Sequence, residues 1–421
     1  MSLMNEPQRL SHEVRQYLIV TGNYWAFTLT DGALRMLVVL HFYGLGYSPL
    51  AIAMLFVFYE FFGVVTNLVG GWLGARIGLN RTMNLGLFLQ VLALVLLAFP
   101  EAKSLSVAWV MMAQALSGVA KDLNKMSAKS AIKTLVVGPD DQTDTRLYRW
   151  VAILTGSKNT LKGIGFFLGG ALLEGFGFSG ALWVMVGVLG LTWLNSTLTL
   201  KNNLGRAKNK PKFRELFSKS PAINYLSAAR LFLFAARDVW FVVALPVFLA
   251  SVLGWNHYQV GGFLACWVMG YGAVQTLAPV ITGHGDQIQP PQAASRWAWC
   301  LAVLPMSIAC ALGLLLPSGN VAVLSSVLLI GLFLFGVVFA VNSSLHSYLI
   351  VRFANAASVS LDVGFYYMAN AMGRLLGTLL SGWVYQQWGL AACLWISSLF
   401  VLLAGVVSLY LPLNTKTCAA G

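Results

Sequence analysis

The chain has 421 residues, of which 58% are hydrophobic and only 10% are charged. A soluble globular domain carries about 25% charged residues, so the composition indicates a protein with many membrane-spanning segments. A net charge of +13 would suit a nucleic-acid partner, but the excess lies in one polar loop and beside the ends of apolar segments. That distribution is typical of a membrane protein, so we expect a lipid bilayer and no nucleic acid around this chain.

Apolar segments follow one another along the chain, and each is long enough to cross a bilayer as a helix. Their spans are 17–43, 50–75, 82–100, 104–136, 149–175, 179–200, 222–250, 258–283, 296–317, 321–348, 354–384 and 389–411. One long polar stretch divides these twelve segments six and six. We therefore predict an all-α polytopic membrane protein with an N-terminal half (1–200), a basic cytoplasmic linker (201–221) and a C-terminal half (222–421).

Lysine and arginine are distributed unequally between the two sets of connections, which predicts the orientation of the chain. If the N-terminus is cytoplasmic, the outer connections contain only Lys103. The cytoplasmic ones contain Arg9, Arg15, Arg76, Arg81, Arg146, Arg352, Lys201, Arg206, Lys208, Lys210, Lys212, Arg214 and Lys219. We expect a multi-pass protein of the cytoplasmic membrane with both termini inside.

The connection between the second and third segments, residues 70–81, resembles the loop motif G-x-L-x-D-R-x-G-R-R of the major facilitator transporters. The residues that fit are Gly71, Leu73, Arg76, Gly78 and Arg81, while Ala75 and Leu79 replace an acidic and a basic residue of the motif. In that family the loop holds the outward-facing state closed on the inside. The resemblance implies a gating role for Gly71, Arg76, Gly78 and Arg81; the alternative is that the two arginines are only positive-inside anchors.

Two six-helix halves joined by a basic loop, together with this motif, predict the major facilitator fold, with inverted three-helix repeats in each half. In that fold helices 1, 4, 7 and 10 line the central path and 2, 5, 8 and 11 lie beside them. A charge at the bilayer centre costs roughly 2.5–3.5 kcal/mol on insertion scales, so buried cations line a polar cavity or find a partner. The apolar segments contain Arg35, Lys121, Lys125, Lys158, Lys162, Arg230, Arg237 and Arg374. So many cations indicate a cavity for a multiply charged anion.

The spacing of these charged residues within their helices indicates which of them pair and which bind an anion. Asp31 and Arg35 are four residues apart and share one face, as a structural ion pair or as a switch at a substrate or proton site. Lys158 and Lys162 share a face near mid-membrane, with no carboxylate of their own helix within reach, and are the strongest anion signal. The alternative is that they pair with Asp31 or Asp122 of other helices.

The fourth helix carries a lysine stripe in which Lys129 and Lys133 are expected at a solvated helix end. Arg374 is expected near the outer end of its helix, where its side chain can snorkel. Neutral donors complete the expected substrate-binding set at Asn342, His346 and Tyr366. The candidate carboxylates for proton coupling are Asp31, Glu60, Asp122, Asp238 and Asp362.

Four stretches resemble a particular family, the organoarsenical efflux permeases of the ArsJ type: 21–35, 58–67, 118–129 and 155–163. The likeness runs from about Tyr17 to about Leu413. It implies export of 1-arseno-3-phosphoglycerate, which a glycolytic glyceraldehyde-3-phosphate dehydrogenase makes when arsenate replaces phosphate, and hence arsenate resistance and a functional partnership with that enzyme. The molecule is anionic at both ends, which suits two cationic clusters, Lys121/Lys158/Lys162 and Arg230/Arg237.

Other functions remain open at this point. An organic phosphate or other organic-anion facilitator or antiporter has the same fold and a similar basic cavity. A membrane enzyme would need a base or metal cluster, but the five histidines are scattered and the five cysteines lack metal spacing, so we expect no metal, cofactor or catalytic centre. A receptor would need a signalling appendage, and the sign of the charge disfavours a cationic-drug pump. The residues do not decide between uniport and proton antiport.

Overall fold

The computed structural model describes residues 6–47, 55–99, 106–135, 142–200, 220–255, 257–283, 290–317, 320–355 and 359–412. Within these ranges the regular secondary structure is α-helical throughout, as the sequence predicts. Most of the expected linker, 201–219, lies outside the described residues. The chain divides into two compact units, which are described separately.

The first unit consists of Met1–Trp150, Ser157–Ser218 and Ala354–Met368. Its helices are α1 (Glu6–Gly44), α3 (Val57–Ile77), α4 (Leu79–Ala98), α5 (Val107–Leu135), nearly all of α6 (Gln142–Thr199) and the start of α12 (Val359–Ser408). The second unit, made of Val151–Gly156, Lys219–Phe353 and Ala369–Gly421, contains the rest of α12. It also holds α7 (Pro221–Phe241), α8 (Ala244–Ser251), α9 (His257–Ile281), α10 (Pro290–Leu315) and α11 (Val321–Phe353).

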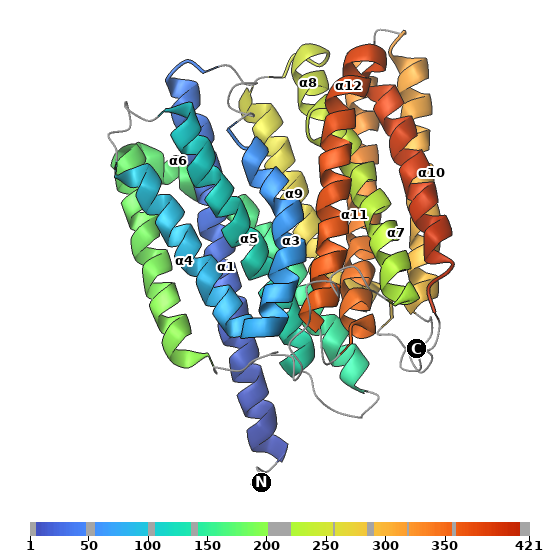
Figure 1. The fold of residues 1–421 in the computed structure, drawn as a ribbon. Coiled ribbons are helices and arrows are strands. Elements are labelled where there is room, and N and C mark those ends of the chain that lie inside the picture. The colour runs from blue at the N-terminus through green and yellow to red at the C-terminus, as the bar shows by residue number, and fades with distance from the viewer. Residues whose placement is uncertain are drawn as a thin grey trace. The chain divides into compact units, whose positions relative to one another are not determined.

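The helices α6 and α12 are each folded back on themselves into two arms, which Figure 1 shows for α12. The reversals occur at Gly177 (φ 67°) and Gly389 (φ 75°), where a positive φ favours glycine over other residues. With these arms counted separately and α7 and α8 taken as one crossing, the described helices account for the twelve segments that the sequence predicts. α6 begins at Gln142, earlier than expected at 149, because a helix can extend beyond its apolar stretch.

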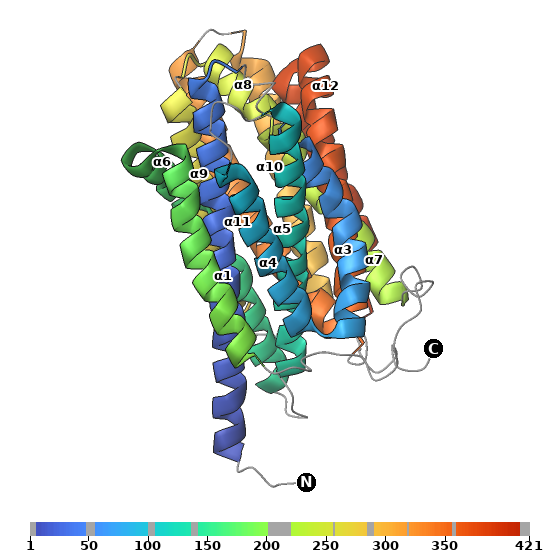
Figure 2. The same ribbon diagram turned by 60° about the vertical axis from the view of Figure 1, so that its left-hand side comes forward.

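Seven of the described helical stretches are long and apolar enough to cross a membrane, judged by length and composition alone. α1, α3 and α5 are not among them. These three helices carry Asp31, Arg35, Glu60, Lys121, Asp122 and Lys125. Charge is thus concentrated in the helices that pack together in the first unit, where α3 and α5 run side by side (Figure 2).

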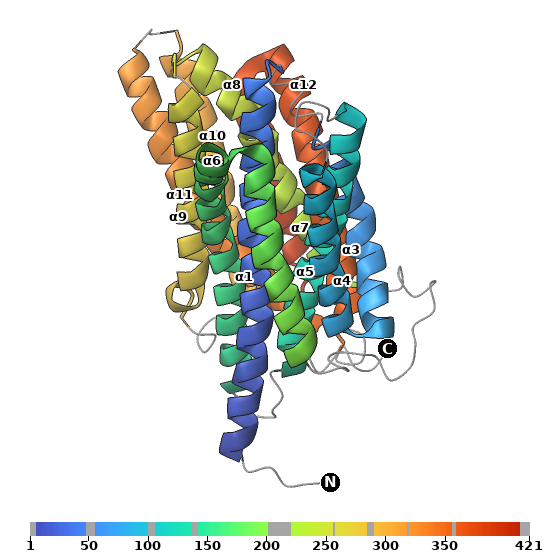
Figure 3. The ribbon, with the colours of Figure 1, turned by 90° about the vertical axis from the view of Figure 1, so that its left-hand side faces the viewer.

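Glycines set the close helix crossings of the first unit. A Cβ added at Gly32 of α1 would lie 2.9 Å from the Lys162 carbonyl oxygen and 3.3 Å from the Cα of Gly165 in α6. At Gly118 of α5 it would lie 2.5 Å from the Tyr59 carbonyl oxygen in α3. The second arm of α6 also lies along α1 (Figure 3), tied to it by a 2.8 Å hydrogen bond between Asn23 and Ser196. These crossings fix the depth at which the charged side chains meet.

An aromatic cluster forms the core of the second unit. The ring of Trp240 lies edge-on to Trp267 and Phe335, with ring centroids 5.9 and 5.1 Å apart. Trp267 stacks in turn on Tyr271 at 5.7 Å. This buried cluster lies beside the helix positions that carry the arginines of α7 and holds α7, α9 and α11 together.

Candidate functional site

In the first unit, Asp31 and Arg35 do not pair with each other but with residues of α3. The Tyr59 hydroxyl donates to both carboxylate oxygens of Asp31, at 2.8 and 3.0 Å. Arg35 donates to Glu60, with 3.4 Å between Nη2 and Oε1. The expected intrahelical pair is therefore absent among the described residues, because the turn of α3 at Tyr59 and Glu60 offers each group a closer partner.

Lys121 of α5 connects this pair of helices to a third carboxylate, Asp122. Its Nζ lies 3.9 Å from Glu60, 3.8 Å from Asp122 and 3.8 Å from the centroid of the Tyr59 ring. Asp122, with its side chain only 2% exposed, also accepts a hydrogen bond from Lys125 at 2.5 Å. The close crossing of α3 and α5 brings all these groups together, so cations and carboxylates alternate through the unit.

The buried part of the lysine stripe on α5 extends one turn further than expected, as far as Lys129. Lys125 and Lys129 lie over the ring of Tyr367 at the start of α12, 4.7 and 5.4 Å from its centroid. Lys129 is only 2% exposed, so the expectation of a solvated helix end is wrong for it. Lys133 is half-buried. The four-residue spacing that continues from Lys121 and Lys125 was the signal for Lys129, and the partner ring explains its burial.

Lys158 and Lys162 lie half-buried on the first arm of α6. Asp31 and Asp122, the carboxylates of the alternative pairing, are in contact with Tyr59, Lys121 and Lys125. The close contact between the Lys162 backbone and Gly32 places this lysine one residue from Asp31 along α1.

In the second unit Arg230 is fixed by neutral groups. Its Nε donates to Asn370 at 2.9 Å, and its Nη1 donates to the carbonyl and hydroxyl oxygens of Ser343 at 3.1 and 3.0 Å. The guanidinium carbon also lies 4.0 Å from the centroid of Phe234. Tyr271 donates a 3.0 Å hydrogen bond to Ser343 and so supports the same site. Arg230 is thus buried, at 3% exposure, among groups that include these neutral acceptors.

Two arginines share one buried carboxylate in the same unit. Arg237 donates to Asp238 at 2.6 Å, and the Nε of Arg374 lies 3.4 Å from the other oxygen of Asp238. The side chain of Asp238 is 2% exposed, whereas those of Arg237 and Arg374 are 16% and 31% exposed. Arg374 thus lies against a buried partner, which differs from the snorkelling side chain expected from its sequence position. Asp238 thus orients both guanidinium groups.

The neutral and remaining acidic candidates lie in different settings. Asn342 of α11 is fully buried, and neither of its amide atoms has a hydrogen-bond partner among the described residues; the Nδ1 of His346, one turn on, lacks one as well. These two side chains are four residues apart and share one face of α11. Tyr366 is fully buried in the first unit. Asp362 accepts a 2.9 Å hydrogen bond from the backbone of Asn355 and orders the start of α12.

The loop motif is built around two glycines in the first unit. A Cβ added at Gly71 would meet the Ser360 carbonyl and come within 3.0 Å of the Cα of Gly364 in the first turns of α12. Gly78 has φ 103°, which favours glycine at the turn from α3 into α4. Arg76 lies 5.0 Å from the ring centroid of Trp72, and Arg76 and Arg81 are both exposed. Steric constraints therefore favour glycine at both positions, and the side chains of Arg76 and Arg81 lie at the surface.

Long apolar helices, the two hairpins and buried charge networks define a multi-pass membrane protein of the transporter class. The family model of the Major Facilitator Superfamily matches residues 18–346, and the chain belongs to this superfamily. No curated protein sequence matches the chain.

Solved structures agree with that fold. The chain is similar to the human organic anion transporter MFSD10 (TETRAN), with 17% identity, a TM-score of 0.70 and coverage of 96% of this chain and 100% of that one. It is similar to the E. coli fucose:proton symporter FucP, with 12% identity, a TM-score of 0.71 and coverage of 95% and 99%. A bacterial homologue of the iron transporter ferroportin has 14% identity, a TM-score of 0.72 and coverage of 94% and 98%. At these identities the likeness concerns the fold alone.

Proposed function

We propose that this transporter exports a small, multiply charged organic anion from the cytoplasm by alternating access. The observation that carries the proposal is the concentration of buried cations within each unit. In the first unit Lys125 and Lys129 are 8% and 2% exposed and Lys158 and Lys162 are half-buried, and in the second unit Arg230 is 3% exposed. Buried charges are costly, so such a concentration of cations is expected where an anion binds.

Each cluster by itself suits one anionic group. Arg237 and Arg374 are oriented by Asp238, and guanidinium groups bind phosphate or carboxylate in two-pronged fashion. The lysines of the first unit act as point charges, and Asn342 and His346 supply donors for neutral oxygens. The similar fold of an organic anion transporter, MFSD10, is compatible with such a substrate class.

Within that class we propose 1-arseno-3-phosphoglycerate as the substrate, on the resemblance of residues 21–35, 58–67, 118–129 and 155–163 to organoarsenical permeases. A glyceraldehyde-3-phosphate dehydrogenase would make this compound, and its export by the transporter would give the cell arsenate resistance. In this proposal both termini lie in the cytoplasm and the protein resides in the cytoplasmic membrane. The second candidate is a general organic phosphate facilitator or antiporter, which the same cation clusters would serve.

Uptake into everted membrane vesicles tests the proposal. Arsenate is supplied with glyceraldehyde-3-phosphate, NAD and the dehydrogenase, and each component is then omitted in turn. Accumulation of arsenic only with the complete mixture supports export of the arsenylated glycerate. Accumulation of 3-phosphoglycerate supplied alone would instead support the general organic-anion function. If none of these anions accumulates, the proposal that the protein transports an organic anion is wrong.

A further inference from the structure

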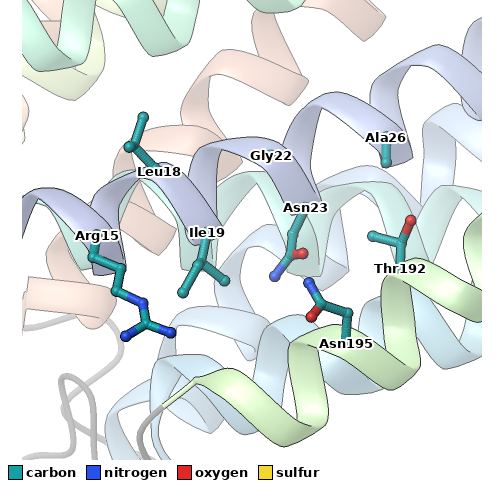
Figure 4. A pocket seen from close by; sticks show the side chains of 8 residues that line it. All are labelled: Arg15, Leu18, Ile19, Gly22, Asn23, Ala26, Thr192 and Asn195. Carbon is teal, nitrogen blue, oxygen red and sulfur yellow. The ribbon is translucent and has the colours of Figure 1, made fainter.

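A pocket of about 400 Å³ lies in the first unit, between the beginning of α1 and the second arm of α6. Its wall includes Arg15, Leu18, Gly22 and Asn23 from α1 with Thr192 and Asn195 from α6 (Figure 4). None of these residues belongs to the candidate substrate site.

The polar wall of this pocket is held in place by a hydrogen-bond chain. The Asn23 amide donates to Ser196 at 2.8 Å, and Ser196 donates to Asn84 of α4 at 2.5 Å. The Oδ1 of Asn23 accepts no hydrogen bond from a described residue, and Figure 4 shows its amide facing that of Asn195. The amides of Asn23 and Asn195 can bind hydroxyl or ester oxygens.

The two ends of the pocket differ in chemistry. Arg15 is exposed and forms no ion pair with a described residue, so its guanidinium is available to an anion. Beside it Leu18 is 59% exposed, and on the facing arm of α6 Leu191, Leu194 and Leu198 are 70%, 51% and 78% exposed. In a membrane protein such leucines contact acyl chains. The pocket thus has a cation at one end and two amides further along α1, and exposed leucines lie on the same two helices, which suits the phosphate, the glycerol oxygens and the acyl chains of a phospholipid.

The charge of the adjoining chain favours an acidic lipid. α6 ends at Thr199, and after Leu200 the sequence continues with Lys201, Arg206, Lys208, Lys210, Lys212, Arg214 and Lys219. Basic clusters next to a membrane helix attract anionic lipids. We propose that the pocket binds one anionic glycerophospholipid, with its phosphate on Arg15 and its glycerol oxygens on Asn23 and Asn195.

Two variants test this site by different means. Arg15→Gln removes the cation, whereas Gly22→Leu fills the pocket with the charge intact; a Cβ at Gly22 has no atom within 4 Å, so this change introduces no clash at that atom. Arg149→Gln is the matched control, because Arg149 is an exposed arginine of α6 outside the pocket. The full chain is purified in detergent with equal amounts of phosphatidylglycerol and phosphatidylcholine, and retained lipid is counted by native mass spectrometry.

We expect wild type and Arg149→Gln to retain one phosphatidylglycerol in preference to phosphatidylcholine. Arg15→Gln should lower that preference about fivefold, the change expected for one basic residue, and Gly22→Leu should lower retention of both lipids. Equal retention by all four proteins would overturn the proposal. So would displacement of the lipid by millimolar inorganic phosphate, which would show that the pocket takes a free phosphate group. Since lipid is counted directly, the result does not depend on the transported substrate.

Discussion

The ammonium of Lys121 lies 3.8 Å from the ring centroid of Tyr59, the residue whose hydroxyl donates to Asp31. One tyrosine thus contacts a cation through its ring and a carboxylate through its hydroxyl. Through Glu60, the next residue of α3, the same turn also reaches Arg35. The helices α1, α3 and α5 therefore meet at a single turn, and we expect a substitution at one of these groups to alter the contacts of the others.

Tyr59→Phe separates the two contacts, because it keeps the ring under Lys121 and removes the donor to Asp31. We expect a lower unfolding temperature, since a hydrogen bond to a buried charged group is worth about 1.5–3 kcal/mol. Thermal unfolding in detergent measures this, with Tyr410→Phe as the control, because Tyr410 is 64% exposed. If Tyr59→Phe and Tyr410→Phe unfold at the same temperature, the hydrogen bond to Asp31 contributes nothing to stability.

The sequence predicts those features of this network that depend on the spacing of residues within a single helix. The apolar segments and the motif glycines follow from local patterns, and the structure has the expected helices with reversals at Gly177 and Gly389. Because residues four apart lie on one face of a helix, their spacing places Asp31 and Arg35 on the same face of α1. That spacing carries no information about residues of other helices. Their real partners depend on the depth at which α1 and α3 meet.

The same limit applies to the other differences. Lys129 is buried by a ring at the start of α12, and Arg374 meets a carboxylate of α7. Both contacts join residues far apart in the chain, at crossings set by close backbone approaches such as that of Gly373 to Leu231. Composition and periodicity therefore predict which residues are charged and buried, whereas helix crossings decide which of them pair.

Lys158→Ala and Lys162→Ala are predicted to abolish transport while folded protein remains in the membrane. A charge-assisted contact to an anion is worth about 1.5–3 kcal/mol, so each loss should lower apparent affinity by at least about tenfold. Vesicle uptake and the yield of monodisperse protein measure the two effects separately. Arg296→Ala serves as the control because Arg296 is exposed at the beginning of α10. Wild-type uptake by both lysine variants would contradict a role for them in anion binding.

Glu60→Gln should alter coupling to protons more than binding of the anion. The neutral amide weakens the hold on Arg35 and Lys121, which lie 3.4 and 3.9 Å from Glu60, and so imitates a protonated carboxyl. If export is proton antiport through this residue, an acidic vesicle lumen drives uptake by wild type but not by Glu60→Gln. Glu174→Gln, at an exposed glutamate of α6, should behave as wild type. Equal stimulation of all three proteins by the pH gradient would assign coupling to another carboxylate.

Asp238→Asn is expected to destabilise the second unit strongly. Arg237 and Arg374 share this buried carboxylate, and removing one partner of a buried ion pair costs about 3–5 kcal/mol because the remaining charge is uncompensated. Arg374→Gln should cost less, since Asp238 keeps its 2.6 Å contact with Arg237. Unfolding temperatures of the two variants, compared in the same detergent, should fall in that order. The reverse order would show that Arg374, not Arg237, is the principal partner.

Gly71→Ala tests whether the loop motif controls a conformational change. A methyl group at Gly71 would meet the Ser360 carbonyl and approach Gly364, so the start of α12 could no longer lie against α3. If this contact forms and breaks during transport, the variant should bind the anion yet transport it more slowly, and cysteines placed beside residue 360 should react faster with a thiol reagent. Gly187→Ala is the control, because a Cβ there meets nothing within 4 Å. Normal transport together with faster labelling would mean that this contact is structural and that gating occurs elsewhere.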